Sequence, residues 1–260
     1  MKTLTHILQT KKAQGEKLFV PYMMAGANGL ENLGAEITAL AAAGASAIEI
    51  GVPFSDPVAD GPVIQLAGLA ALANGVSLKK IVAALQTIDA SVPLILMGYA
   101  NSFFHYGLEQ LAEDLKDTSV KGAIIPDLPY EHRNFVLPTF EQYDLALIQL
   151  VSLTSPHARI ATLVQEAEGF VYAVTINGTT GTGKTYQNNL DDHLKEIIAL
   201  APVPVLAGFG VSTPQHVARF NQCCDGVVVG SKIVATLQKE GLAATANLVR
   251  QLTGRLESKD

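Results

Sequence analysis

Apolar runs of strand length recur along the chain, and a helix-like stretch follows each of them. There are eight such runs, at residues 18–26, 46–53, 92–101, 122–129, 145–153, 169–177, 203–210 and 226–231. Their hydrophobicity is nearly continuous, which is typical of parallel strands covered on both faces. Stretches between them, such as "LENLGAEITALAAAG" and "LKKIVAALQTI", have the apolar spacing of amphipathic helices.

Eight strand–helix units predict an α/β fold, namely a single (β/α)8 TIM barrel that occupies residues 1–260 as one domain. An open, doubly wound sheet would usually carry G-x-G-x-x-G at its first turn, and "MAGANGLE" does not contain it. The spacing of Leu4, Ile7 and Leu8 predicts an extra N-terminal helix. Residues 54–75 predict an extended loop between the second strand and a helix near Ser77, in the place where barrels build active sites.

The glycine-rich segment "GTTGTGKT", at residues 178–185, fits the phosphate-loop pattern of nucleotide hydrolases. A true phosphate loop opens a helix directly at its Lys-Thr pair, whereas here "YQNN" follows Thr185 and the helical pattern begins near Leu190. The preceding strand is also the sixth of eight. We therefore interpret the segment as a loop over the barrel mouth, whose glycines allow backbone amides to approach a ligand.

Composition narrows the function classes. The net charge is −6 and the basic clusters are no longer than two residues, so a nucleic-acid partner is not expected. No apolar run reaches the roughly 18 residues of a membrane span, and the N-terminus does not have the apolar core of a secretory signal. Adjacent Cys223 and Cys224 are expected to be free thiols, which indicates a reducing cytoplasm.

Glu49 is the sharpest single signal of chemistry. Alternation along the second strand turns Ile48 and Ile50 toward the covering helices, so Glu49 should point into the barrel near its C-terminal end. Burial of an unpaired carboxylate raises its pKa, and a pKa near neutrality suits a general acid or base. A buried glutamate satisfied by the backbone or a hydroxyl is the structural alternative.

Asp60 lies in the loop that leaves the same strand. The sequence Asp-Gly-Pro is also an ordinary turn and helix-start sequence, so a structural role remains open. Its position beside Glu49 favours the chemical role, because two carboxyl groups in different environments can divide acid and base functions.

A phosphate site is predicted at the loops after the seventh and eighth strands, where barrels often bind phosphate. These loops read "AGFGVS" and "VGSKIVATL". Gly210 and Gly230 would expose backbone amides, and Ser231 would cap a helix and bind an oxyanion, with Gly181 closing the far side. Tight turns that need glycine are the alternative.

Other residues at strand ends would shape the pocket. Tyr99, Tyr172 and Asn101 are placed to orient a polar substrate group, and Phe209, Met97 and Tyr22 to line a flat apolar pocket; packing within the barrel is an equal alternative for each. No predicted strand carries an internal lysine, and the six histidines have no metal-ligand spacing. Proton transfer without a metal or covalent cofactor is therefore expected.

The segment "EIGVPFSDPVADGPVIQ", at residues 49–65, resembles the signature of the tryptophan synthase alpha chain family. Supporting matches run in order through the chain, among them "LMGYAN", "PDLPYE", "AGFGVS" and "VVGSKIV". The resemblance implies cleavage of indole-3-glycerol phosphate to indole and glyceraldehyde 3-phosphate. It implies that Glu49 shuttles the protons, that Asp60 accepts from the indole N–H and that Tyr99 helps to place Asp60. It further implies Tyr172 near the glycerol hydroxyls, Phe209 in the indole pocket and Gly181, Gly210, Gly230 and Ser231 around the phosphate.

The family works with a beta chain, so the resemblance implies an alpha2beta2 heterotetramer with Pro53, Asp56 and Asn101 near the contact. It implies no cofactor in this chain and pyridoxal phosphate in the beta chain only. Three positions depart from the family pattern, namely Ala27, Val63 and Ile176, and they affect loop closure and the response to the partner. A stand-alone lyase that releases free indole remains an alternative. So does a non-catalytic regulatory subunit that binds the phosphate ester.

Overall fold

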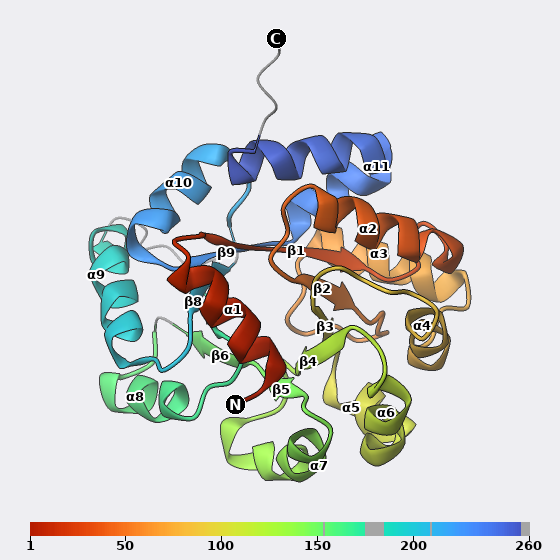
Figure 1. Cartoon of the computed structure of the whole chain (residues 1–260), viewed down its shortest axis with the longest axis horizontal. Coiled ribbons are helices and arrows are strands. Elements are labelled where there is room, and N and C mark those ends of the chain that lie inside the picture. The colour runs from red at the N-terminus through yellow and green to blue at the C-terminus, as the bar shows by residue number, and fades with distance from the viewer. Residues whose placement is uncertain (153, 175–184, 209, 256–260) are drawn as a thin grey trace.

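The strands form a parallel barrel surrounded by a ring of helices (Figure 1). The computed structural model describes residues 1–152, 154–174, 185–208 and 210–255, without the side chains of residues 185–189. In this part of the chain the sheet order is β5-β4-β3-β2-β1-β9-β8-β7-β6. The strands are β1 (Leu18–Met24), β2 (Ile48–Gly51), β3 (Leu94–Met97), β4 (Val120–Ile124), β5 (Ala146–Leu147), β6 (Gln149–Ser152), β7 (Val171–Val174), β8 (Val205–Gly208) and β9 (Gly226–Val229).

The two ends of this sheet belong to one stretch of chain. Only Ile148 separates β5 from β6; β5 pairs with β4, and β6 pairs with β7. The fifth strand therefore joins both edges and closes the barrel. Each of the eight predicted apolar runs overlaps a strand, so the predicted TIM-barrel fold is confirmed.

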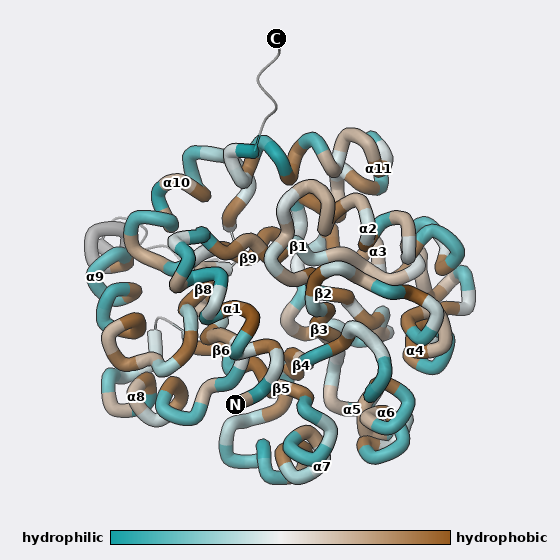
Figure 2. The backbone as a smooth tube through the Cα atoms, viewed as in Figure 1, coloured by the Kyte–Doolittle hydropathy of each residue, from teal (hydrophilic) through white to brown (hydrophobic). Residues whose placement is uncertain are grey.

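The helices lie outside the strands. Brown, hydrophobic residues predominate along the strands, and most teal, hydrophilic segments lie on the surrounding helices and loops (Figure 2). The α-helices are α1 (Thr3–Ala13), α2 (Leu33–Ala42), α3 (Pro62–Ala73), α4 (Leu78–Leu85), α5 (Ala100–Tyr106), α6 (Leu108–Leu115), α7 (Leu137–Gln142), α8 (His157–Gln165), α9 (Thr185–Leu200), α10 (Pro214–Cys223) and α11 (Ser231–Thr253). Two short 3-10 helices are η1 (Leu30–Asn32) and η2 (Tyr130–Phe135).

The predicted N-terminal helix is present as α1, and it closes one end of the barrel. Leu4 and Leu8 are fully buried and pack against the side chains that fill the barrel interior, including Leu18 and Phe170. The hydroxyl of Thr5 accepts a hydrogen bond from the backbone N–H of Gly169. Because these contacts lie at the starts of the strands, the opposite end of the barrel is available for a site.

More than half of the insertion after β2 is helical, where an extended loop was expected. Residues 52–61 form a loop, and α3 then begins at Pro62, which occupies a first-turn position that has no need of an N–H donor. Ala67 and Ala71 bury one face of α3, which contacts β1 and α11. The insertion is thus anchored to the barrel at both ends.

Two expectations about individual elements are wrong. The strand β4 begins at Val120, not Gly122, because Val120 pairs with Leu94, and the strand therefore includes Lys121. The ammonium group of Lys121 donates to the backbone carbonyl of Thr118, which precedes β4. Lys121 therefore lies at the start of the strand and not at its C-terminal end, where the site is expected. The second error concerns α9, which begins at Thr185 and not near Leu190. The first turn of α9 is polar, so the apolar spacing used for the prediction does not detect it. The start of α9 therefore no longer argues against a phosphate loop at residues 178–185. Residues 178–184 themselves lie outside the described residues.

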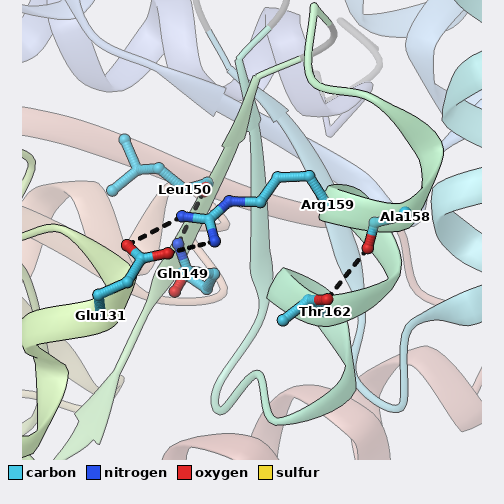
Figure 3. A network of polar contacts seen from close by, with 6 residues as sticks. All are labelled: Glu131, Gln149, Leu150, Ala158, Arg159 and Thr162. Atoms are coloured by element: carbon cyan, nitrogen blue, oxygen red, sulfur yellow. Dashed lines mark hydrogen bonds and ion pairs between the residues drawn. The ribbon is translucent and has the colours of Figure 1, made fainter.

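A polar network ties the segment after β4 to α8 (Figure 3). The two terminal guanidinium nitrogens of Arg159 each donate to one oxygen of the Glu131 carboxylate, Nη2 at 3.1 Å. The guanidinium of Arg133 lies 4.0 Å from the centre of the Tyr130 ring, and that of Arg159 lies 5.4 Å from it. These contacts hold η2 against α8.

Several features bear on the expectations from composition. Cys223 and Cys224 are both free thiols, as predicted, and both are buried. Within the described ranges, no single helix is long and apolar enough to cross a membrane. The same residues contain no cluster of three or more His, Cys, Asp or Glu side chains placed to hold a metal ion.

Candidate active site

Glu49 lies on the inner face of β2, close to the C-terminal end of the strand. Tyr22 of β1 and Ile95 of β3 are its register partners, whereas Ile48 and Ile50 pack with the outer core. The alternation predicted from the sequence is therefore correct. The Glu49 side chain is 1% exposed, and neither carboxyl oxygen has a hydrogen-bond partner among the described residues. Burial, together with the nearby Asp60 carboxylate, raises the pKa of Glu49 to about 8.

Asp60 is the second carboxyl group of the site, and Tyr99 fixes its position. The Tyr99 hydroxyl donates to Asp60 Oδ2 at 3.1 Å and accepts from the backbone N–H of Ala59 at 2.9 Å. The Tyr99 ring stacks on Phe54, with 5.0 Å between ring centres. Partial burial raises the pKa of Asp60, and the hydrogen bond from Tyr99 opposes this rise. Asp60 therefore has a hydrogen-bond donor that opposes the effect of burial, whereas Glu49 has none among the described residues.

Two tyrosines lean over glycines of neighbouring strands. A Cβ atom built on Gly51 would lie 2.0 Å from the Tyr22 hydroxyl oxygen, and one built on Gly208 would lie 2.1 Å from the Tyr172 ring. Only glycine therefore leaves room for these rings at the barrel mouth. Burial, followed by the two carboxylates, raises the pKa of Tyr22 and of Tyr172 well above 10. Both phenols remain neutral hydrogen-bond donors at physiological pH.

The two loops predicted to bind phosphate come together at the start of α11. Gly230 immediately precedes this helix and Ser231 is its first residue, with no side-chain cap on the first turn. Gly210, in the loop after β8, has a φ of +72°, a backbone conformation that favours glycine. The free N–H groups at a helix N-terminus favour an anion.

One cavity of about 270 Å³ connects these groups. Eight of the predicted site residues line it: Tyr22, Glu49, Asp60, Met97, Tyr172, Gly210, Gly230 and Ser231. Tyr99 reaches the site through Asp60 and is not a wall residue. Gly181 and Phe209, predicted for the phosphate and the indole, lie outside the described residues, as does Ile176.

The predicted partner residues have different surroundings. Asp56 and Asn101 are exposed, and the Ser55 hydroxyl donates to the Asp56 carboxylate at 2.6 Å. Pro53 is buried within the chain, so it does not offer a free surface.

Six wall residues were not singled out from the sequence: Gly61, Ile64, Val211, Ser212, Val228 and Lys232. Gly61 follows Asp60, Val211 and Ser212 follow Gly210, and Lys232 follows Ser231. Proximity in sequence to a predicted site residue is the signal that would have found these four. Val228 needs the barrel geometry, because an apolar strand residue looks the same whether it faces a cavity or the core.

The fold and the cavity define a TIM-barrel enzyme with a carboxyl pair at the barrel mouth. The family model described as tryptophan synthase alpha chain matches residues 8–259. The tryptophan synthase alpha chain of Streptococcus gordonii is 56% identical over 241 residues, covering 92% of this chain and 93% of the relative. That of Listeria welshimeri is 49% identical over 250 residues and covers 96% of each chain.

Solved structures give the same result. The alpha subunit of tryptophan synthase from Legionella pneumophila superimposes with a TM-score of 0.88 at 29% identity, covering 98% of each chain. An aminoacrylate-bound tryptophan synthase from M. tuberculosis gives 0.87 at 31% identity, covering 99% of this chain and 100% of that one. The chain belongs to the tryptophan synthase alpha chain family. It is accordingly a carbon–carbon lyase of tryptophan biosynthesis that cleaves indole-3-glycerol phosphate.

Proposed function

We propose that Glu49 and Asp60 carry out this cleavage as an acid–base pair in the barrel mouth. The observation that carries the proposal is the Glu49 carboxyl group, which is buried at the cavity wall without a hydrogen-bond partner among the described residues. A structural glutamate would satisfy its oxygens within the protein. An unpaired carboxyl group with a pKa of about 8 is available to exchange protons with a ligand.

The reaction needs two proton transfers: one to C3 of the indole ring and one from the side-chain hydroxyl group next to the ring. Glu49, mostly protonated at neutral pH, gives its proton to C3 of the indole ring, and the ring nitrogen becomes positively charged. Asp60 accepts the hydrogen bond from the indole N–H and stabilises this charge. Glu49, now a carboxylate, removes the proton from the side-chain hydroxyl group next to the ring. The carbon–carbon bond breaks, its electron pair returns to the ring, and indole and glyceraldehyde 3-phosphate separate.

The remaining predicted residues hold the substrate. Tyr172 is close enough to Glu49 and Asp60 for both carboxylates to raise its pKa. In this position it orients the glycerol hydroxyl groups of the substrate. Tyr22 and Met97 line the part of the cavity that takes the indole. Gly210, Gly230 and Ser231 bind the phosphate at the start of α11. Phe209 and Gly181 complete the indole and phosphate subsites in this proposal, and the whole chain, 1–260, acts as one domain.

A beta chain is the proposed partner, in an alpha2beta2 heterotetramer. Large apolar side chains are exposed in the segments after β2 and β3: Val58 at 82%, Leu66 at 64%, Leu69 at 55% and Phe104 at 45%. Leu66 and Leu69 share a face of α3, one turn apart. Exposed apolar groups of this size favour a protein contact, and the neighbouring Asp56 and Asn101 supply polar ones. Pyridoxal phosphate belongs to the beta chain in this proposal, this chain holds no cofactor, and the complex works in the cytoplasm.

The experiment is indole release from indole-3-glycerol phosphate, measured with and without a beta chain. We expect slow release by the chain alone and faster release in the complex. Release that ignores the beta chain would indicate a stand-alone lyase. Binding of the phosphate ester without any release would indicate a regulatory subunit instead.

A further inference from the structure

The charged groups around the cavity are unevenly distributed. Two carboxyl groups, Glu49 and Asp60, belong to its wall, and Lys232 is the one cationic side chain among the described wall residues. Lys232 is the second residue of α11 and is exposed. It forms no ion pair with any other described residue. Its ammonium group is therefore not committed to a carboxylate of the protein.

Lys232 lines the end of the cavity that is predicted to bind phosphate. A Cβ atom on Gly230 would lie 3.5 Å from Ile64 Cδ1 and 3.6 Å from Tyr22 Cβ, so these two side chains close the cavity beside Gly230. The first turn of α11 presents backbone N–H groups there, without a side-chain cap. Lys232 is the second residue of this helix and lines the cavity beside Gly230 and Ser231.

A phosphate dianion needs more than backbone amides in this environment. The N-terminus of a helix supplies a charge equivalent to about half a proton. The dianion must also approach Asp60, and Glu49 whenever it is ionised, which repel it. A lysine ammonium group at the helix start adds a full positive charge, which offsets the repulsion between the phosphate and the two carboxylates.

We infer that Lys232 is a substrate-binding residue whose ammonium group forms an ion pair with the phosphate of the substrate. This inference rests on the proposed function of the cavity. It assigns Lys232 to the selection of phosphorylated substrates: the free indole product, which carries no charge, does not use the contact. The second product, glyceraldehyde 3-phosphate, retains the phosphate and therefore the contact, so only the release of indole is independent of Lys232.

The test compares Lys232→Gln with Lys232→Arg and with a matched control, Lys239→Gln, which changes an exposed lysine further along α11. Three quantities are measured: KM for indole-3-glycerol phosphate, the dissociation constant of inorganic phosphate and that of indole. For Lys232→Gln we expect KM and the phosphate constant to rise about tenfold, as for one lost charge-assisted hydrogen bond. The indole constant stays unchanged, Lys232→Arg retains most of the phosphate affinity, and Lys239→Gln behaves as the native chain.

Salt provides a further readout that a packing defect would not change. The phosphate affinity of the native chain should fall more steeply with ionic strength than that of Lys232→Gln. Unchanged phosphate affinity in Lys232→Gln, or equal losses for phosphate and indole, would overturn the inference. Failure of the native chain to cleave the substrate would contradict the proposed function instead, and the phosphate measurements would still decide on Lys232.

Discussion

The hydroxyl group of Tyr99 donates to the carboxylate of Asp60 at 3.1 Å, and it accepts from the backbone of the preceding residue at 2.9 Å. The Tyr99 hydroxyl group, in the connection between β3 and α5, thus holds both the backbone of the loop after β2 and the Asp60 carboxylate in that loop. The two groups come from different barrel units, 39 residues apart. The position of Asp60 in the cavity therefore depends on a residue that does not line it.

Tyr99→Phe should leave the fold intact and weaken catalysis. Without the hydrogen bond, the pKa of Asp60 rises further, because burial is no longer opposed. A smaller fraction of Asp60 is then ionised, so the acid limb of the kcat/KM profile should move to higher pH, and turnover should fall about five- to tenfold. Tyr106→Phe is the control, since its hydroxyl bonds to Asp114 on α6. Equal effects of the two substitutions would show that Tyr99 acts through packing alone.

Glu49→Gln should change how stability depends on pH. The folded-state pKa of Glu49, about 8, lies above the ordinary glutamate value of 4.5, so the folded chain binds more protons than the unfolded chain between these two pH values. Stability is then full below about pH 4.5 and is lost as pH rises toward and through 8. Glutamine cannot ionise, so the variant should be more stable than the native chain at pH 9, by on the order of 5 kcal/mol. The two should differ little at pH 5.

Urea unfolding at the two pH values measures this difference. Glu240→Gln, a change at an exposed carboxyl group on α11, serves as the reference. An equal stability difference at pH 5 and pH 9 would mean that Glu49 does not titrate as its burial requires.

Much of the fold follows from the sequence, because parallel barrel strands are continuous apolar runs. Alternation also gives the inward direction of Glu49. The starts of β4 and α9 were predicted wrongly, since Lys121 and the polar residues after Thr185 lack an apolar signal at those positions. Such ends are set by pairing and capping, which a hydropathy pattern does not record.

The site is only partly readable in the same way. The resemblance supplied the pairing of Tyr99 with Asp60, and no spacing rule brings two residues 39 positions apart into contact. Ile64 can be assigned to the cavity wall only when α3 and α11 are placed side by side. The close approach of Tyr22 to Gly51 is likewise a property of two neighbouring strands and not of either segment.

Gly51→Ala tests that close approach. The added methyl group would lie 2.0 Å from the Tyr22 hydroxyl oxygen, so the ring must move into the cavity. We expect a loss of about 1–3 kcal/mol in the free energy of unfolding and a higher KM. Gly34→Ala is the matched control: its methyl group would lie 3.4 Å from Ile88, and alanine favours the helix, which should add up to about 1 kcal/mol. Unchanged stability and KM in Gly51→Ala would show that Tyr22 moves freely at this position.

The most direct measurement is single-turnover indole release by the native chain and by Glu49→Gln, each in complex with a beta chain and with substrate binding measured separately. A general acid–base group contributes about 10²–10⁴-fold. The account predicts that Glu49→Gln binds indole-3-glycerol phosphate with nearly native affinity and releases indole at least about a hundredfold more slowly. Release by Glu49→Gln at a rate close to that of the native chain would contradict the assignment of proton transfer to Glu49.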